Sequence, residues 1–192
     1  MRDRHLVIMV KEPRPGRVKT RLGRDIGMVP AAWWFRHQTR ALIRRLEDPR
    51  WHLWLSVSPD IAGLQSRIWP AHMPRLAQGR GDLGQRMGRI FRAMPRGPVL
   101  IIGGDIPGIQ PQQIHHAFAQ LGRHQTVFGP ATDGGYWLIG MQRSGAIPAT
   151  LFQNVRWSTR HAMADTIASL PGQRIGFTKT LRDVDTAADL SA

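Results

Sequence analysis

The sequence predicts a single α/β domain over residues 1–192, a Rossmann-like arrangement with a mixed, mostly parallel sheet and helices on both faces. Three observations support this prediction. Strand-like apolar runs alternate with helix-like periodic segments along almost the whole chain. The strongest apolar run ends in a Gly- and Asp-rich loop, a feature typical of the carboxyl edge of parallel strands. The 192 residues, 42% of them hydrophobic, can bury a sizeable core without disulfides.

Apolar runs bounded by turn residues define the expected strands. Residues 5–11 form a short apolar run that stops at a loop containing two prolines and a glycine. Residues 98–102 form the most apolar run, which stops at Gly103, Gly104 and Asp105. The expected strands cover residues 5–11, 51–57, 75–78, 98–102, 126–128, 136–141 and 174–177.

Helical periodicity is clearest after Pro30, which suits the first turn of a helix. One face of this segment is apolar and carries Phe35, Thr39, Leu42, Ile43 and Leu46. The opposite face carries Arg36, Arg40 and Arg44, which is typical of a solvated face; an RNA-binding stripe is the alternative. The expected helices cover residues 30–46, 59–68, 83–94, 111–121 and 159–170.

The composition is strongly basic, with a formal net charge of +14. Lysine occurs only at Lys11, Lys19 and Lys179, so arginine supplies the other 24 of the 27 basic residues. This balance favours anionic partners such as nucleotides or nucleic acid. Nucleic acid is the less favoured of these, because the arginines are scattered over every segment and no RNA-binding motif recurs. The absence of cysteine excludes a disulfide framework, a thiolate metal site and a cysteine nucleophile.

The chain shows no targeting or membrane-spanning segment. The apolar run that follows Arg2 and Arg4 covers only residues 6–10, which is too short for a signal peptide or a membrane span. We therefore expect a cytoplasmic protein. The sequence does not determine its oligomeric state.

The loop after the first expected strand, residues 11–22, gathers two of the three lysines with three arginines. Gly16 would let a phosphate approach the backbone, and Lys19 and Arg21 would supply positive charge. The spacing is not that of a Walker loop. A solvated basic loop is the alternative, but the rarity of lysine elsewhere favours phosphate binding.

Asp105 follows the most apolar strand, where a carboxylate suits Mg²⁺ or Mn²⁺ held partly by phosphate oxygens. The alternative is a helix cap or a turn, but Asp105 lies too early to cap the helix near Pro111. Asp133, Gly134 and Gly135 fit an ordinary hairpin turn when taken alone. Taken with Asp105, Asp133 could complete a metal site or position an acceptor.

Two further segments precede expected helices. Asp82 fits the N-cap position of the helix over residues 83–94, with contact to an acceptor or a base as the sharper alternative. Ser158 fits a helix cap better than a nucleophile. No Ser-His-Asp arrangement is evident, and the eight histidines show no metal-binding spacing.

Several motifs occur in a fixed order over nearly the whole chain: KEPRPGRVKTRL, DLGQRM, GGDIPGI, GPATDGGYWLIG, WST and DVDTAADL. Together they resemble the bacterial glycosyltransferase-like family known as selenodomain-associated transferases. This family is distantly similar to phospholactate guanylyltransferase and molybdenum-cofactor guanylyltransferase. The resemblance implies a nucleotide-diphospho-sugar transferase fold of the GT-A type.

The resemblance also implies roles for individual residues. The expected nucleotide-binding residues are Lys11, Pro15, Gly16, Lys19, Arg21, Asp82 and Gly104. The expected acceptor-binding residues are Arg86, Asp133, Gly134, Gly135 and Tyr136. Asp105 and Asp133 would bind Mg²⁺ or Mn²⁺, and Lys19, Arg21 and Asp105 would be catalytic.

The expected partners are a nucleoside triphosphate or nucleotide-sugar donor and a small acceptor that the sequence does not identify. Glycosyltransferases of this fold often carry an Asp-x-Asp motif, whereas Asp105 is followed by Ile106 and Pro107. This departure favours nucleotidyl transfer to a phosphorylated or hydroxyl acceptor. Glycosyl transfer from a nucleotide-sugar is the alternative, and a nucleic-acid-binding protein is the alternative from another class.

Overall fold

Seven strands form one sheet in the order β3-β2-β1-β4-β6-β5-β7 in the computed structural model, which describes residues 3–182, 186 and 188–189. Strand β6 is antiparallel to both of its neighbours, and every other pairing in the sheet is parallel. The sheet is therefore mixed and mostly parallel, as the sequence predicts. The strands are β1 His5–Lys11, β2 His52–Ser58, β3 Arg75–Ala77, β4 Val99–Gly103, β5 Thr126–Pro130, β6 Tyr136–Met141 and β7 Ile175–Phe177.

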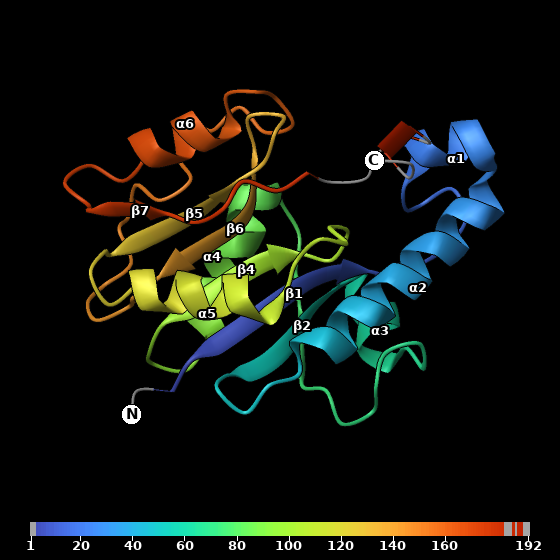
Figure 1. The fold of residues 1–192 in the computed structure, drawn as a ribbon, viewed down its shortest axis with the longest axis horizontal. Coiled ribbons are helices and arrows are strands. Elements are labelled where there is room, and N and C mark those ends of the chain that lie inside the picture. The colour runs from blue at the N-terminus through green and yellow to red at the C-terminus, as the bar shows by residue number, and fades with distance from the viewer. Residues whose placement is uncertain (1–2, 183–185, 187, 190–192) are drawn as a thin grey trace.

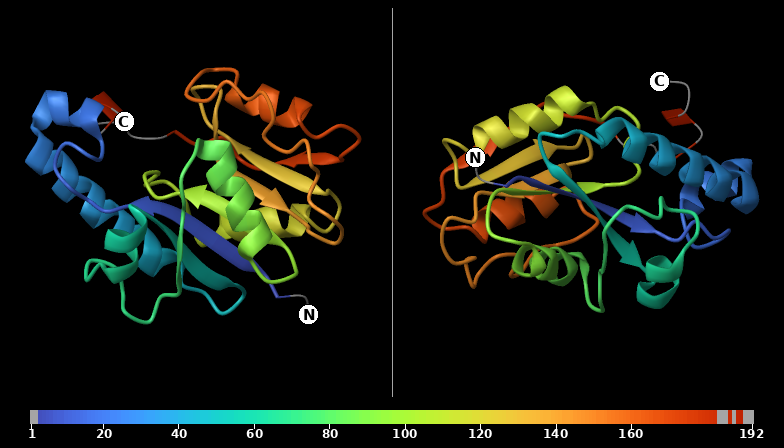
Figure 2. Two further views of the ribbon diagram at one scale, coloured as in Figure 1. Left: turned by 180° about the vertical axis from the view of Figure 1, so that it is seen from behind. Right: turned by 90° about the horizontal axis from the view of Figure 1, so that it is seen from below.

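Helices cover both faces of this sheet (Figures 1 and 2). Alternate residues of β1 divide between two apolar layers, because successive strand residues point to opposite faces. Leu6 and Ile8 pack with α2 and α5, whereas Val7 packs with α4. The helices are α1 Thr20–Ile26, α2 Met28–Leu46, α3 Asp60–Gln65, α4 Leu83–Ala93, α5 Pro111–Gln120 and α6 Ala162–Ala168.

The main departure from the sequence-based prediction is helix α1, which was not expected. Its seven residues include Gly23 and carry no acidic residue in the first turn, so local propensity for a helix is weak. Packing against α2 stabilises it instead. A Cβ at Gly23 would lie 2.5 Å from the sulfur of Met28, so a larger residue there would require the Met28 side chain to move. Helix α2 consequently begins at Met28, two residues before Pro30.

Helix α6 is shorter than predicted at both ends and begins at Ala162 with His161 as its N-cap. The expectation that Ser158 caps this helix is therefore wrong. Residues 158–161 form turns in which the Thr159 hydroxyl donates to the Arg156 carbonyl and accepts from the His161 amide. Ser158 itself has a left-handed backbone conformation, with φ of 59°.

The N-cap of α4 follows the sequence-based prediction. Asp82 is the N-cap of α4, and its side chain accepts a hydrogen bond from the Gln85 amide in a capping box. Gln110, rather than Asp105, is the N-cap residue of α5, and its amide donates to Oε1 of Gln113 at 2.6 Å. Asp105 is therefore left for another role. No helix in the described residues is long and apolar enough to cross a membrane.

His5 lies buried at the start of β1, at the sheet edge opposite the carboxyl ends. Its ring stacks on His52 at 5.4 Å, and neither ring nitrogen has a hydrogen-bond partner within the described part of the chain. Burial lowers the pKa of His5 below 6.5, and the charges of His52 and Arg143 lower it further, against an opposing effect of Asp3. The folded protein therefore resists protonation of this ring more than the unfolded chain does.

This burial predicts acid sensitivity. His5 contributes stability that is present above its unfolded pKa near 6.5 and is lost as pH falls through the lower folded pKa. We expect the melting temperature of the native protein to decrease as the pH is lowered below 6.5. His5→Phe should make the melting temperature less dependent on pH in this range. His72→Gln, at an exposed histidine beside Glu47, should leave the profile unchanged. Parallel profiles for His5→Phe and the native protein would contradict the prediction.

Candidate active site at the carboxyl edge of the sheet

A cavity of about 750 Å³ lies at the carboxyl ends of the parallel strands β1 and β4. This volume lies within the range of small-molecule sites. Strand β6 contributes its first residues to the same edge because it runs antiparallel to β4. The remaining walls come from the loop before α1, from α2 and from α4.

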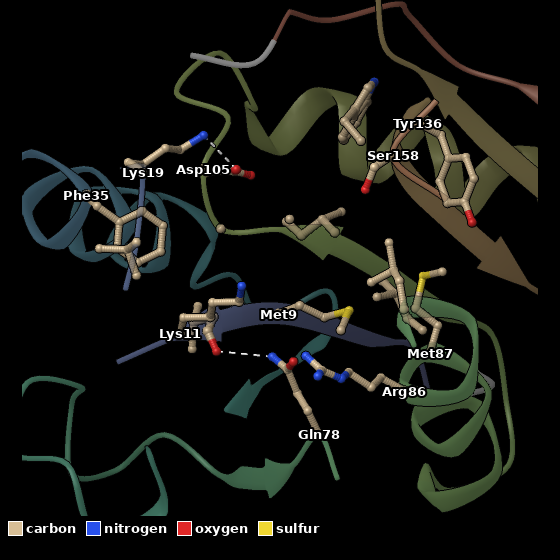
Figure 3. Close-up of a pocket in the computed structure, with 18 of the residues that line it drawn as sticks. Met9, Lys11, Lys19, Phe35, Gln78, Arg86, Met87, Asp105, Tyr136 and Ser158 are labelled. Carbon is tan, nitrogen blue, oxygen red and sulfur yellow. Dashed lines mark hydrogen bonds and ion pairs between the residues drawn. The ribbon is translucent and has the colours of Figure 1, made fainter. Parts of the chain in front are cut away.

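An ion pair crosses one end of the cavity (Figure 3). The Nζ atom of Lys19 lies 2.8 Å from Oδ2 of Asp105, and their side chains are 6% and 37% exposed. The backbone of Lys19 is left-handed, with φ of 44°, and Lys19 is the N-cap of α1. The structure therefore brings together two residues 86 positions apart that the sequence analysis assigned to one site.

Asp105 is held by the loop that follows β4. Arg45 donates hydrogen bonds to the carbonyls of Pro107 and Ile109, which fix the far side of this loop. Gly104 lies against β1, where a Cβ would come within 3.1 Å of the Met9 carbonyl. Its amide donates to that carbonyl and its own carbonyl accepts from Thr39. Gly104 thus allows close packing, although it also lines the cavity.

The loop after β1 separates into residues that face a cavity and residues that do not. Lys11 and Arg17 line both the main cavity and a second, smaller cavity of about 460 Å³. Arg21 lines the main cavity. Pro15 and Gly16 line neither, and Gly16 serves a turn in which its φ is 72° and its Cβ position faces open space. The expectation that Gly16 admits a phosphate is therefore not supported by its position.

Helix α4 brings Asp82 and Arg86 to the cavity, as the sequence analysis expected. The Nε atom of Arg86 donates to the Gly81 carbonyl at 3.0 Å, which orients its guanidinium. Asp82 lines the cavity while its Oδ1 accepts from the Gln85 amide at 2.8 Å. One carboxylate oxygen of Asp82 is therefore committed to the cap.

The Asp133 turn is the clearest difference from the expected site. Asp133 Oδ1 accepts from the Gly135 amide at 2.8 Å, which is the turn chemistry of an Asx motif. Gly134 has φ of 87°, and a Cβ there would meet the Arg160 carbonyl at 2.3 Å. These three residues pack the hairpin onto the segment before α6 and are not among the residues that line the cavity.

Tyr136, which was grouped with that turn, does line the cavity. Its hydroxyl lies 3.3 Å from Oγ1 of Thr166, and burial raises its pKa. The tyrosine is therefore neutral, and its side chain forms part of the cavity wall. Ser158, also labelled in Figure 3, lines the same cavity.

Gln78 is a cavity residue that the sequence analysis missed. Its side chain is buried, and Nε2 donates to the carbonyls of Val10 at 3.1 Å and Ser56 at 2.8 Å. Both amide hydrogens are thus used by the backbone, which leaves Oε1 as the acceptor that Gln78 can offer to a ligand. At the end of a three-residue strand, Gln78 gave no signal in sequence beyond its polarity.

The acidic residues of the cavity determine how well a metal would fit. Asp105 is half-buried at the cavity, and no cluster of three or more His, Cys, Asp or Glu side chains occurs in the described residues. This set suits Mg²⁺ or Mn²⁺ that takes most of its ligands from phosphate oxygens and water, as Mg²⁺ commonly does. It does not form a protein cage for Ca²⁺ or Zn²⁺.

Comparison with protein families identifies the chain. Residues 41–159 match the family described as "Uncharacterized protein conserved in bacteria (DUF2064)". The chain belongs to this family. The DUF2064 match includes Gln78, Arg86, Asp105 and Tyr136, whereas Lys19 precedes it. A comparison with curated proteins found no match.

Solved structures with the same fold extend over the whole DUF2064 chain. A candidate nucleotide-diphospho-sugar transferase from Desulfovibrio desulfuricans G20 is 28% identical, with a TM-score of 0.83, over 99% of this chain and 85% of that one. The inositol-1-phosphate CTP transferase from T. maritima is 12% identical, with a TM-score of 0.62, over 98% and 92% of the two chains.

A third solved structure with this fold holds a metal. The Rv0371c protein from Mycobacterium tuberculosis H37Rv, in complex with manganese, is 16% identical with a TM-score of 0.58, over 99% and 96% of the two chains. These comparisons establish the nucleotide-diphospho-sugar transferase fold for this DUF2064 protein and support a transferase. They do not distinguish the type of transfer.

The motif DVDTAADL, which begins at residue 183, falls largely on residues outside the described part of the chain.

Proposed function

We propose that this protein is a metal-dependent transferase that takes a nucleoside triphosphate or nucleotide-sugar donor, with nucleotidyl transfer as the preferred reaction. The ion pair between Lys19 and Asp105 within a cavity of nucleotide size is the observation that carries this proposal. In this proposal Lys19 would bind phosphate and Asp105 would bind the metal.

The charge of the cavity supports a phosphate-bearing donor. The acidic residues that line the cavity are Asp82 and Asp105. Five basic side chains also line it, those of Lys11, Arg17, Lys19, Arg21 and Arg86. Cations fixed in a partly desolvated site stabilise phosphate charge more strongly than they would in water. One carboxylate oxygen of Asp82 is held in its cap, whereas Asp105 lies beside Lys19, so we assign the metal to Asp105.

Asp105 would hold Mg²⁺ or Mn²⁺ together with phosphate oxygens, and the metal would supply neutralisation of charge on those phosphates. In nucleotidyl transfer, an acceptor oxygen attacks the α-phosphorus, the bond from that phosphorus to the bridging oxygen breaks, and pyrophosphate leaves. Lys19 and Arg21 would stabilise the charge that develops on pyrophosphate. A phosphate acceptor would need no general base.

The Lys19–Asp105 pair has a direct consequence for the order of binding. Lys19 would compete with a divalent cation for the Asp105 carboxylate, and the phosphates of a bound donor would offer Lys19 an alternative partner. Lys19 would thus couple metal binding to donor binding.

Gln78 would fix the orientation of the donor. Its Oε1 would accept a hydrogen bond from an amino group of the base or a hydroxyl of the sugar.

Asp133 stays a predicted second metal ligand, and Gly134 and Gly135 stay predicted acceptor-binding residues.

Thermal shift with nucleoside triphosphates and nucleotide-sugars, each with and without Mn²⁺, tests this function. A ligand at 100 times its dissociation constant adds about 2.7 kcal/mol, or a rise of roughly 5–10 °C for a domain of this size. We expect a metal-dependent rise that Asp105→Asn abolishes. The donor that binds is then incubated with the protein and candidate acceptors, and the released product is identified. Release of pyrophosphate identifies nucleotidyl transfer, and release of a nucleoside diphosphate identifies the alternative, glycosyl transfer. No rise with any donor would contradict the proposal.

The buried amide of Gln78 gives a prediction about stability. Gln78→Met removes two hydrogen bonds and leaves the buried carbonyls of Val10 and Ser56 without this donor. We expect a loss of about 1–3 kcal/mol in the free energy of unfolding, measured by urea denaturation. Gln112→Met on the exposed side of α5 is the matched control and should change little. Equal stability of both variants would show that the amide of Gln78 is not held as the structure describes.

A further inference from the structure

Helices α1 and α2 form an arm that extends beyond the sheet (Figures 1 and 2). The buried face of α2 packs on the sheet and lines the cavity through Phe35. The outer face of α2 is not used by the proposed function. We define the arm surface as Met28, Val29, Trp33, Arg36, Arg40 and Arg44.

The apolar part of the arm surface lies at the tip. Met28, Val29 and Trp33 are 38%, 54% and 54% exposed, and all three lie in the first two turns of α2. Gly27, just before them, joins α1 to α2 at the outer end of the arm. Val29 and Trp33 are therefore exposed at a protruding end, where their exposure to water is unfavourable, and Met28, which also lies against Gly23 of α1, is partly exposed beside them.

The basic part of the arm surface lies directly behind the tip. Arg36, Arg40 and Arg44 follow one another at helical spacing, and α2 contains no Asp or Glu. The guanidinium of Arg36 lies 5.6 Å from the centre of the Trp33 ring. The arm surface is thus ordered along the helix, with an apolar end followed by a cationic stripe.

We propose that the arm surface docks on a membrane that contains anionic phospholipid. Apolar side chains at a protruding end can enter the acyl boundary while arginines behind them meet the headgroups, as in interfacial amphipathic helices. The positive charge of the stripe complements the negative charge of the lipid surface. Docking would bring the α2 wall of the cavity to the membrane.

Other occupants fit this surface less well. A symmetric second copy would place two arginine stripes of like charge in one interface. Single-stranded nucleic acid is bound by aromatic rings on which successive bases stack. Trp33 is the one aromatic residue exposed here, and its ring already stacks on His37 at 5.7 Å. Met28 and Val29 would add nothing to base stacking.

Sedimentation with vesicles tests the proposal, using phosphatidylcholine alone and phosphatidylcholine mixed with phosphatidylglycerol. We expect binding to the anionic vesicles only, weakened by added salt. The pair Arg40→Gln and Arg44→Gln should lower the partition coefficient about 20- to 30-fold, since each arginine near such a surface contributes about 1 kcal/mol. The pair Val29→Ser and Trp33→Ser should lower it about tenfold or more.

Two matched pairs of control substitutions test whether vesicle binding depends on the arm surface or only on the overall charge and the exposed apolar side chains of the protein. Arg96→Gln with Arg123→Gln removes the same charge elsewhere, and Ile61→Ser with Leu64→Ser removes exposed apolar side chains elsewhere. Both should leave binding unchanged. All changed residues are exposed, so each variant should keep the native melting temperature.

Four outcomes would overturn the proposal. They are no binding to anionic vesicles, equal loss in the matched pairs, binding of a labelled single-stranded RNA in place of vesicles, and self-association in ultracentrifugation that Trp33→Ser abolishes without vesicle binding. Donor binding in the thermal shift does not depend on the arm surface, so failure here is distinct from failure of the proposed function.

Discussion

Replacing Asp105 with asparagine is expected to lower turnover by at least about 100-fold while the far-UV circular dichroism stays native. Asparagine has the same size and keeps an oxygen that can accept from Nζ of Lys19, which lies 2.8 Å from the carboxylate in the native protein. It removes the negative charge on which the metal depends, and loss of one preorganised electrostatic contact of this kind typically costs two to three orders of magnitude in rate.

Mn²⁺ binding should fall in the same variant. The affinity for Mn²⁺ in the presence of the donor can be followed by the electron paramagnetic resonance of the free ion. Asp48→Asn is the matched control, because Asp48 forms an ion pair with Arg50 in the segment before the amino end of β2 and is not among the cavity residues. Activity close to native in Asp105→Asn would remove the metal assignment, whatever its stability.

The second prediction concerns Lys19, whose replacement should lower kcat/KM but raise the affinity of the donor-free protein for Mn²⁺. Lys19→Met should lower kcat/KM about 100- to 1,000-fold, because the cation that stabilises the departing phosphate is lost. The same change should tighten binding of Mn²⁺ to the donor-free protein, since lysine no longer competes for Asp105. From the usual strength of partly exposed ion pairs we expect a gain of roughly two- to fivefold.

The control for Lys19 is Lys179→Met, at an exposed lysine. It should change neither kcat/KM nor the affinity for Mn²⁺. A lower affinity of Lys19→Met for Mn²⁺ without donor would mean that Lys19 supports the metal site rather than competing with it. Unchanged turnover in Lys19→Met would place phosphate binding on Arg21 or Arg86 instead.

Local patterns in the sequence predicted the fold well. The strand bounds at His5–Lys11 and Tyr136–Met141 agree with the structure residue for residue, because apolar runs ended by turn residues are short-range signals. The cap of α4 at Asp82 was predicted correctly for the same reason, whereas the cap residue of α5, Gln110, was not predicted. Helix α1 was missed because its stability comes from packing of Gly23 against Met28, which no local pattern encodes.

The site was predicted in part. Lys19, Arg21, Asp82, Arg86, Asp105 and Tyr136 line the cavity, because each follows or begins an element whose end reaches the carboxyl edge of the sheet. Asp133 is not among the residues that line it, and one oxygen of its carboxylate accepts from the Gly135 amide within its own turn. The motif spacing is the same for a ligand-binding turn and a structural one, so sequence could not separate the two.

The sequence by itself determined the α/β class, the strand and helix faces, the basic character and the residue types at the ends of the central strands. These follow from periodicity, composition and turn chemistry, which act over a few residues. The tertiary structure decided that Lys19 pairs with Asp105, that Gln78 presents Oε1, and that Met28, Val29 and Trp33 remain exposed. Each of these depends on contacts, or on the absence of cover, between segments distant in the chain, and only the packed fold brings such segments together.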